Sequence, residues 1–387
     1  MAFRKILFWS HLAAGLVAGL FILAMSVTGV LLTYEHAIIS AVARADTVEV
    51  PPDGQRLSLD ALAEQAREQA PDGVRGLLMS VVNRPDAPVT IYQLGHGQQV
   101  LDPYTGAPVE ARAGAVEAMF HEIVELHRWL GFQGASRDVA RALTGAANLV
   151  FLFLIVSGLY LWFPKVWKWT FFRLNLFFRS GLPTSKARDY NWHHVFGIWA
   201  LVPLFVVVAT GVVMSYPWAN AALYRAFGES PPQRQGPAFM GGGDLGKATE
   251  AAAQPGTLAS LQQAFDTAAA SDAGWTKINL IVPKPDETQV RIMVNNGNGY
   301  LAEQRTTHIY SLTAGEIVSS TRYSDMSPAQ KARMFVRFGH TGEQFGLIGS
   351  TVAGLASLAA CFLVYTGSAL SWRRLVLQVW RRRKRRA

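Results

Sequence analysis

The sequence has little charge and almost no cysteine. Only 16% of its 387 residues are Asp, Glu, Lys or Arg, whereas soluble domains carry about 25%. Cys361 is the single cysteine, which excludes a disulfide framework, a thiolate zinc site and the paired cysteines that attach haem covalently. His121, Glu122 and His127 do not match the His-Glu-x-x-His spacing of a zinc protease. A disulfide-stapled, zinc-binding or proteolytic protein is therefore not expected.

Charge is absent from four stretches of about 20 residues, each long enough to cross a bilayer as a helix. No acidic or basic side chain lies inside them to couple ions, which disfavours a transporter. The fold class predicted is membrane α-helical, with four transmembrane helices at residues 1–33, 142–163, 193–216 and 346–371. The uncharged stretches themselves are Leu12–Leu32, Ala142–Phe163, Val195–Ser215 and Gly346–Leu370.

The first stretch is expected to be retained rather than removed as a signal peptide. Ala43-Arg44-Ala45 offers a superficial cleavage site. The preceding uncharged stretch is longer than the roughly 7–15 apolar residues of a signal peptide. We therefore count it as the first transmembrane helix.

Basic residues gather on one side of the predicted spans, and they account for the net charge of +9. Arg4 and Lys5 precede the first span, six basic residues lie in loop 164–192, and the tail 372–387 is strongly basic. Positive residues mark the cytoplasmic side, so both termini are expected inside. The tail is expected to contact anionic lipid head groups rather than nucleic acid.

The two long segments on the other side of the membrane share one order of elements, a short helix followed by strands. This order predicts two small α+β domains and an internally duplicated chain. The first domain spans 34–115 and is followed by an amphipathic helical segment at 116–141. The second region spans 217–345 and contains a flexible linker at 231–256 ahead of its α+β domain. The helices are expected at 58–69 and 257–268, and the strands at 77–82, 89–94, 99–102, 277–282, 289–294 and 307–312.

Two of the uncharged runs repeat one pattern of histidine and glycine. Each has a histidine, a glycine four residues later, and a Thr-Gly pair whose glycine is the eighteenth residue after the histidine. Eighteen residues make five helical turns, which would place the histidine and distal glycine on one face, about 27 Å apart. The residues are His11, Gly15, Thr28 and Gly29 in the first run, and His193, Gly197, Thr210 and Gly211 in the third.

Four histidines fall at two levels of the predicted bundle. His11 and His193 begin spans at the cytoplasmic face, whereas His127 and His340 precede spans at the opposite face. Neutral imidazole is a good axial ligand for haem iron, and facing helices can hold a cofactor between them. We therefore predict two b-type haems, one bound by each histidine pair.

Glycines complete this prediction because they would leave room beside each haem. Gly29 and Gly211 would lie beside the haem of His127 and His340, and Gly158 and Gly367 beside the haem of His11 and His193. His194 and His36 are reserve ligands. The alternative is that these histidines only end helices and that small residues, such as Gly15-x-x-x-Gly19, pack helices together.

The ordered set of motifs resembles the PepSY-associated transmembrane family of bacterial iron-regulated inner-membrane proteins. The resemblance covers nearly the whole chain. It is carried by His11 through Gly29, Leu126–Gly131, Ser157–Trp162, Trp192–Gly197 and His340–Gly342. The two α+β units, which end at Asp102–Gly106 and Thr313–Glu316, look like PepSY domains. The sequence is most similar to the ferrioxamine-type siderophore reductases, which the resemblance implies are di-haem b proteins of the inner membrane with periplasmic domains.

The expected function is thus an oxidoreductase, a haem-dependent ferric-siderophore reductase. A cytoplasmic electron donor would supply electrons and an Fe(III)–siderophore would receive them in the periplasm, with a TonB-dependent uptake system upstream. The alternative is a membrane-anchored regulator or inhibitor of a periplasmic partner, without redox activity. That alternative explains the small domains but gives the histidine–glycine pattern no role.

Overall fold

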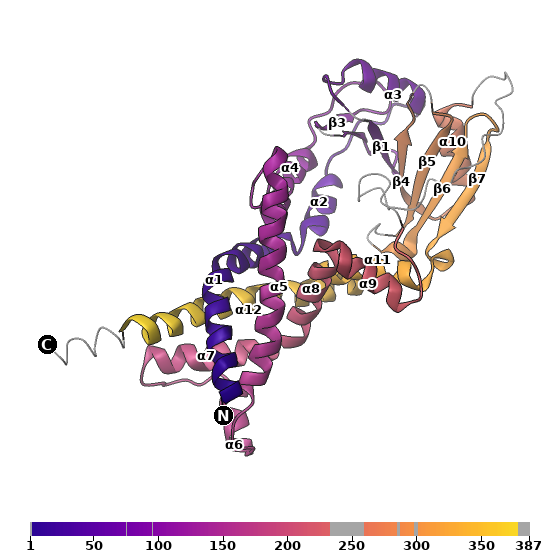
Figure 1. The fold of residues 1–387 in the computed structure, drawn as a ribbon. Coiled ribbons are helices and arrows are strands. Elements are labelled where there is room, and N and C mark those ends of the chain that lie inside the picture. The colour runs from indigo at the N-terminus through magenta and orange to yellow at the C-terminus, as the bar shows by residue number, and fades with distance from the viewer. Residues whose placement is uncertain are drawn as a thin grey trace. The chain divides into compact units, whose positions relative to one another are not determined.

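The computed structural model describes residues 2–74, 76–94, 96–232, 259–284, 287–297 and 301–377. The chain divides into two compact units (Figure 1). The helical unit comprises Met1–Glu35, Phe120–Ala226 and Ala332–Ala387, and the sheet unit comprises His36–Met119 and Phe227–Lys331. Most of the predicted linker at 231–256 and the end of the basic tail lie outside the described residues.

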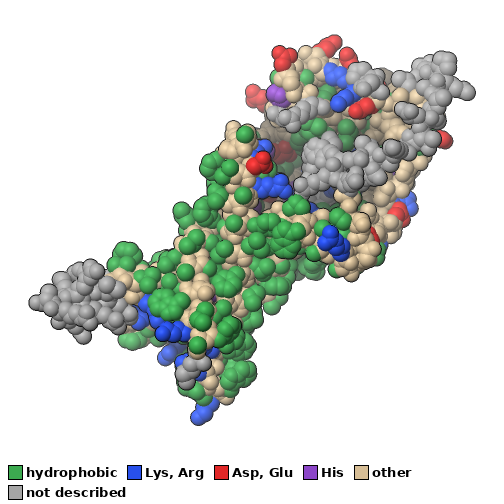
Figure 2. All heavy atoms as spheres, viewed as in Figure 1, with side chains coloured by type: hydrophobic (Ala, Val, Ile, Leu, Met, Phe, Trp, Pro, Cys, Tyr) green, Lys and Arg blue, Asp and Glu red, His purple; other side chains and the backbone are tan. Residues whose placement is uncertain are grey.

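Three helices of the described chain are long and apolar enough to cross a membrane. They are α1 (Ala2–Leu32), α5 (Arg137–Trp162) and α12 (Gly346–Trp372). Side chains such as Val17 and Ile348 are more than three-quarters exposed on their surfaces, and hydrophobic atoms cover this part of the molecule (Figure 2). The unit therefore presents an apolar exterior suited to lipid.

The predicted third span is not one straight helix. It consists of α7 (Ser185–Trp199) and α8 (Leu201–Ser215), which meet at an angle of 67° and make a fourth span only if the bent pair is counted as one. Pro203 has no N–H to donate to the carbonyl of Trp199, and its ring would clash with that carbonyl in a continuous helix. The prediction that His193 and Gly211 share one straight helix face is therefore wrong.

The four longest segments pack around one another through small residues. α1 lies against α5 and α12, α7 against α12, and α8 against α5 (Figure 1). Gly15 faces Leu154 of α5 and Gly19 faces Val364 of α12, so the Gly-x-x-x-Gly motif does serve packing. Small residues of this kind let helix backbones approach closely in lipid.

Shorter helices complete the helical unit. α4 (Arg112–Trp129) leads into it and carries His127, and α11 (Pro328–Thr341) carries His340. Three short helices did not figure in the sequence prediction: α6 (Trp169–Leu176) in the basic loop and α9 (Pro217–Ala226) in the helical unit, and α2 (Glu35–Ala43), which lies in the sheet unit except for its first residue. Single 3-10 turns, Gly134–Ser136 and Glu343–Phe345, precede α5 and α12, and a π-helical segment, Arg373–Leu377, follows α12.

The sheet unit contains one antiparallel sheet of seven strands in the order β3-β2-β1-β4-β5-β6-β7. Its core is formed by large aliphatic side chains, among which Met79, Ile91 and Ile292 are fully buried. Helices α3 (Leu59–Glu68) and α10 (Leu261–Ser271) pack against this core. The strands are β1 (Leu77–Val82), β2 (Val89–Gln93), β3 (Gly97–Leu101), β4 (Trp275–Val282), β5 (Gln289–Asn296), β6 (Arg305–Ser311) and β7 (Glu316–Arg322).

The sequence predicted two separate α+β domains. In the structure, the two predicted domains form one sheet unit instead. β1 pairs with β4 from Leu77↔Val282 to Val82↔Lys277, which joins both halves in one sheet. The helices are also joined at their N-termini, where backbone N–H groups lack intrahelical partners. Asp60 accepts hydrogen bonds from the N–H groups of Leu261 and Gln262, and the Gln262 side chain accepts one from Leu59. Each half therefore completes the other.

Most predicted elements of the sheet unit are present with small shifts of boundary. α10 begins later than predicted because Ser260 and Gln263 form a capping box there. The predicted turn at Thr313–Glu316 leads into β7, which was not predicted. β7 is largely exposed and polar, so it lacks the apolar alternation that identifies a strand in sequence.

Candidate functional site

The four predicted ligand histidines all lie in the helical unit. His127 and His340 face each other, with ring centroids 6.5 Å apart and planes inclined by 63°. His11 on α1 and His193 on α7 each contact a Ser/Thr-Gly pair of another helix, His11 on α5 and His193 on α12. The structure thus brings His127 and His340 together as the sequence indicated.

A hydroxyl group from a neighbouring helix contacts Nδ1 of every one of these histidines. The helix that supplies the hydroxyl is different in each case, so four helices take part. The pairs are His11–Ser157 at 2.8 Å, His127–Thr28 at 2.8 Å, His193–Thr366 at 2.9 Å and His340–Thr210 at 3.2 Å.

These contacts fix which ring nitrogen carries the proton. Each hydroxyl donates its own hydrogen to the carbonyl four residues earlier in its helix, at 2.6–2.7 Å. The hydroxyl oxygen is then left to accept a hydrogen bond from Nδ1–H. His340 Nδ1 also lies 2.8 Å from the carbonyl oxygen of Val207, which can only accept. Each neutral ring therefore keeps the lone pair on Nε2, the form in which histidine binds a metal.

The glycine after each hydroxyl residue accommodates the histidine ring itself. A Cβ atom at Gly158 would lie 3.3 Å from Cε1 of His11, and one at Gly367 would lie 3.4 Å from Cε1 of His193. At Gly211 and Gly29 the corresponding distances to His340 and His127 are 3.3 and 3.7 Å. The sequence placed these glycines beside a haem. In the structure each lies near an imidazole; a Cβ atom at Gly158, Gly211 or Gly367 would crowd the ring, whereas one at Gly29 would be in ordinary van der Waals contact with it.

The His127–His340 pair has a separation that fits two axial ligands of one metal. An imidazole nitrogen lies about 2 Å from a metal that it binds, so two rings on opposite sides of one ion have centroids about 6 Å apart. The observed 6.5 Å is close to this value. Among the described residues no group of three or more His, Cys, Asp or Glu side chains could hold a metal ion.

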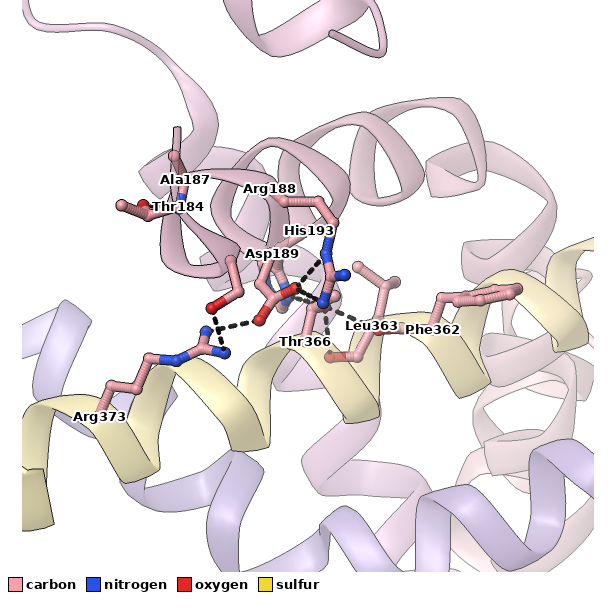
Figure 3. Close-up of polar contacts among 10 residues, drawn as sticks. Thr184, Ala187, Arg188, Asp189, His193, Phe362, Leu363, Thr366 and Arg373 are labelled. Atoms are coloured by element: carbon pink, nitrogen blue, oxygen red, sulfur yellow. Dashed lines mark hydrogen bonds and ion pairs between the residues drawn. The ribbon is translucent and has the colours of Figure 1, made fainter. Parts of the chain in front are cut away.

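Ion pairs hold the helices that carry the histidines. Asp189, whose side chain is fully buried, pairs with Arg188 at 2.8 Å and with Arg373 just beyond α12 (Figure 3). It lies one turn before His193 on α7, and Figure 3 shows His193 directed at Thr366 of α12. The Asp189–Arg373 contact therefore fastens α7 to α12 beside the histidine.

A second ion pair fixes the end of α4. The buried carboxylate of Glu125 lies 2.5 Å from Arg137 at the start of α5. The guanidinium of Arg137 also lies 4.5 Å from the ring centroid of Trp129, a favourable cation–π distance. Gly131 adopts a φ of +76° just after the helix, which glycine tolerates best. Gly131 thus follows the end of α4, while His127 itself faces His340.

A family model described as the PepSY-associated TM region matches residues 8–374. The chain belongs to the PepSY-associated transmembrane family. No curated protein matches this chain significantly.

The remaining histidines of this PepSY-associated protein lie outside the two pairs. The reserve ligand His194 contacts Tyr190, with ring centroids 4.1 Å apart and planes inclined by 34°, and its Nδ1 lies 2.9 Å from the Tyr190 carbonyl oxygen. The other reserve ligand, His36, is in α2 of the sheet unit. His121 is exposed beside Glu125, and His308 is buried in β6 between Ser271 and Ser320.

Sequence reasoning missed the polar groups that orient the histidines of this PepSY-associated protein. In the four Ser/Thr-Gly pairs, the sequence predicts a role for the glycines but none for the hydroxyl groups. Asp189 and Glu125 were not singled out, because a carboxylate near basic residues in a loop or amphipathic helix is common. Only the partners on other helices distinguish them.

Proposed function

We propose that this chain holds two b-type haems and carries electrons across the bacterial inner membrane to reduce an Fe(III)–siderophore. The observation that supports this most strongly is the fourfold repeat of one arrangement. In each copy a Ser or Thr hydroxyl receives Nδ1–H, the next residue is a glycine against the ring, and Nε2 is left for a metal. Packing alone does not require four histidines in the same tautomer.

In this proposal, His11 and His193 hold one haem and His127 and His340 the other. A bound haem supplies one-electron redox chemistry, and the protein sets its potential through axial ligands, hydrogen bonds and burial. The hydroxyls of Thr28, Ser157, Thr210 and Thr366 orient the imidazoles and raise their basicity as ligands. The ion pairs of Asp189 and Glu125 keep the ligand-bearing helices in place.

The proposed orientation follows from charge. Lys and Arg gather where α6 and α7 lie (Figure 2), and such residues favour the cytoplasmic side. Both termini and the His11 pair would then be cytoplasmic, and the His127 pair and the sheet unit periplasmic. An electron donor in the cytoplasm would act at one face and the ferric siderophore at the other.

Reduction would release the iron because ferrous ion binds the hard oxygen ligands of a siderophore more weakly than ferric ion does. The sheet unit would provide the docking surface for the siderophore. A TonB-dependent uptake system is the expected source of this substrate. The proposal assigns no acid–base residue, because the transfer of an electron to iron breaks no covalent bond.

The test is reoxidation of the reduced protein. Detergent-purified protein is reduced with dithionite, freed of excess reductant without oxygen, and mixed with a ferric hydroxamate siderophore while its visible spectrum is recorded. We expect the spectrum of the oxidised protein to return and Fe(II) to be captured by a ferrous chelator. The gallium(III) form of the same siderophore is the control, since it has a similar shape but accepts no electron. Absence of reoxidation by the ferric form would overturn the proposed reaction.

A further inference from the structure

The helical unit contains a cavity of about 610 Å³ that the proposed reaction has not used. It lies between the start of α1, the end of α5, the loop with α6, and the first half of α7. Four cationic side chains line it: Arg4, Lys165, Arg179 and Lys186. Neither Asp nor Glu is among its lining residues. The cavity therefore favours a ligand with negative charge.

Aromatic rings form another part of the same wall. Tyr190 and His194 line the cavity with their rings in contact and their planes inclined by 34°, and Phe171 lines it from α6. Flat apolar faces beside positive charge suit a planar aromatic ring attached to a phosphate. The volume is within the range of about 300–1,000 Å³ that small-molecule sites occupy.

Hydrogen bonds hold the walls of the cavity in place. The Asn191 side chain accepts from the backbone N–H of Arg179 at 3.1 Å and donates to the carbonyls of Leu174 and Phe177, each at 3.0 Å. Arg4 donates to the carbonyls of Leu161 and Phe163 at 2.7 and 2.8 Å. The loop is thus fixed to α5 and α7, as a preformed site requires.

The cavity is also next to one of the predicted ligands. His194 lines the cavity, and its ring centroid is 6.3 Å from that of His193 on the same helix. The indole N–H of the buried Trp162 donates to the carbonyl of His194 at 3.2 Å, which ties this part of α7 to α5. A ring stacked on His194 would be one side chain away from His193.

We propose that this cavity binds reduced flavin mononucleotide, the isoalloxazine ring against Tyr190 and His194 and the phosphate among the lysines and arginines. The assignment rests on the proposed function, because it identifies the class of the cytoplasmic electron donor. A nicotinamide cofactor gives up a hydride, whereas a flavin also takes part in one-electron chemistry. A quinol carries no phosphate to meet the four cations.

The electrons and protons balance. One reduced flavin mononucleotide loses two electrons and two protons and becomes the oxidised flavin. Each ferric siderophore accepts one electron, so one flavin reduces two ferric ions. The protons are released on the side of the cavity.

The first test measures binding without turnover. Full-length protein in nanodiscs of phosphatidylcholine is titrated into oxidised flavin mononucleotide, and quenching of flavin fluorescence is recorded. We expect saturable quenching, and roughly tenfold weaker binding of riboflavin, which has the ring but no phosphate. Absence of saturable quenching would overturn the proposal.

Paired variants show whether the cavity is the site. The double variant Lys165→Gln, Lys186→Gln should weaken flavin mononucleotide binding roughly tenfold and leave riboflavin binding unchanged. The matched control is Lys168→Gln, Arg173→Gln, which removes the same charge from the same loop outside the cavity lining. Equal losses in the two double variants would show a general effect of charge and overturn the assignment.

A third arm distinguishes the flavin from a lipid phosphate. In nanodiscs with phosphatidylglycerol we expect flavin binding to persist with modest competition. Complete loss of binding there would show that the cavity holds an anionic lipid head group and would overturn the proposal.

The flavin proposal and the proposed function fail in different ways. If flavin does not bind to a haem-containing protein that reduces ferric siderophore, only the assignment of the electron donor is overturned. If flavin binds to a protein without haem, the proposed function falls instead.

Discussion

The helical unit and the sheet unit bury different kinds of side chain. Ile91, Leu280 and Ile292 are fully or almost fully buried in the sheet unit, where apolar area removed from water supplies the stability. The helical unit buries fewer large apolar side chains, such as Ile22, and more hydroxyl groups, including Thr28, Ser157 and Thr366, together with the carboxylate of Asp189. Several of its largest apolar side chains face outward. The sheet unit therefore has a large aliphatic core. In the interior of the helical unit, hydroxyl groups contact four histidines.

The largest effect is expected at Asp189, because its removal leaves two arginines without their buried partner. We predict that Asp189→Ala destabilises the helical unit by about 3 kcal/mol or more, because the fully buried carboxylate loses charge-assisted hydrogen bonds to both arginines, each of which contributes about 1.5–3 kcal/mol. Thermal unfolding of the detergent-solubilised protein measures the loss. Lys168→Ala in the neighbouring loop is the control. An Asp189→Ala protein as stable as this control would contradict the assigned role.

A comparable loss of stability, without loss of haem, is expected when the core of the sheet unit is changed. Leu280→Ala should lower the free energy of unfolding by about 2–5 kcal/mol, as large-to-alanine changes do in packed cores. The visible spectrum should stay unchanged, because Leu280 contacts the sheet core and not the histidines. A loss of haem bands in this variant at low temperature would break the proposed division of roles.

A smaller and purely local effect is expected at Thr28. Thr28→Val preserves shape but removes the oxygen that accepts from His127 Nδ1. Groups that orient a metal ligand typically contribute 10–100-fold in affinity, so we expect one of the two haems to be bound roughly 10–100-fold more weakly. The control is Thr351→Val on α12, whose hydroxyl contacts Tyr34. Equal haem retention in both variants would remove the role assigned to the hydroxyl.

The smallest effect is a dependence of stability on pH in the sheet unit. Burial lowers the pKa of His308 below its usual 6.5, and the charge of Arg322 acts in the same direction. The unfolded chain then binds the proton more readily than the folded one, so stability is present above pH 6.5 and is lost as pH falls below it. His308→Asn should reduce the difference in unfolding temperature between pH 7.5 and pH 5.5. An unchanged difference would contradict this prediction.

The sequence predicted local features of the two units better than their long-range contacts. Leu77–Val82 is a strand as predicted, and the uncharged runs of α1, α5 and α12 are helices as predicted. The sequence did not reveal that β1 pairs with β4, because that register depends on residues about two hundred positions apart. The bend at Ala200 has a local signal in Pro203, which the histidine–glycine spacing does not take into account.

The candidate site was predictable in its residue types but not in its chemistry. His11, His127, His193 and His340 could be chosen from their positions at the ends of apolar runs. Which nitrogen each histidine presents depends on a hydroxyl from another helix, and only the folded structure supplies that partner. That the glycines leave room beside a haem stays a prediction; the structure shows an imidazole near each of them.

The most direct test of the central claim is the haem content of the purified protein, measured by the pyridine haemochrome assay with the visible spectrum. We predict two b-type haems per chain. His127→Ala should lose one of them, while His121→Ala, a change to an exposed histidine on the same helix, should retain both. A colourless protein from haem-replete cells, or equal haem content in the two variants, would contradict the account.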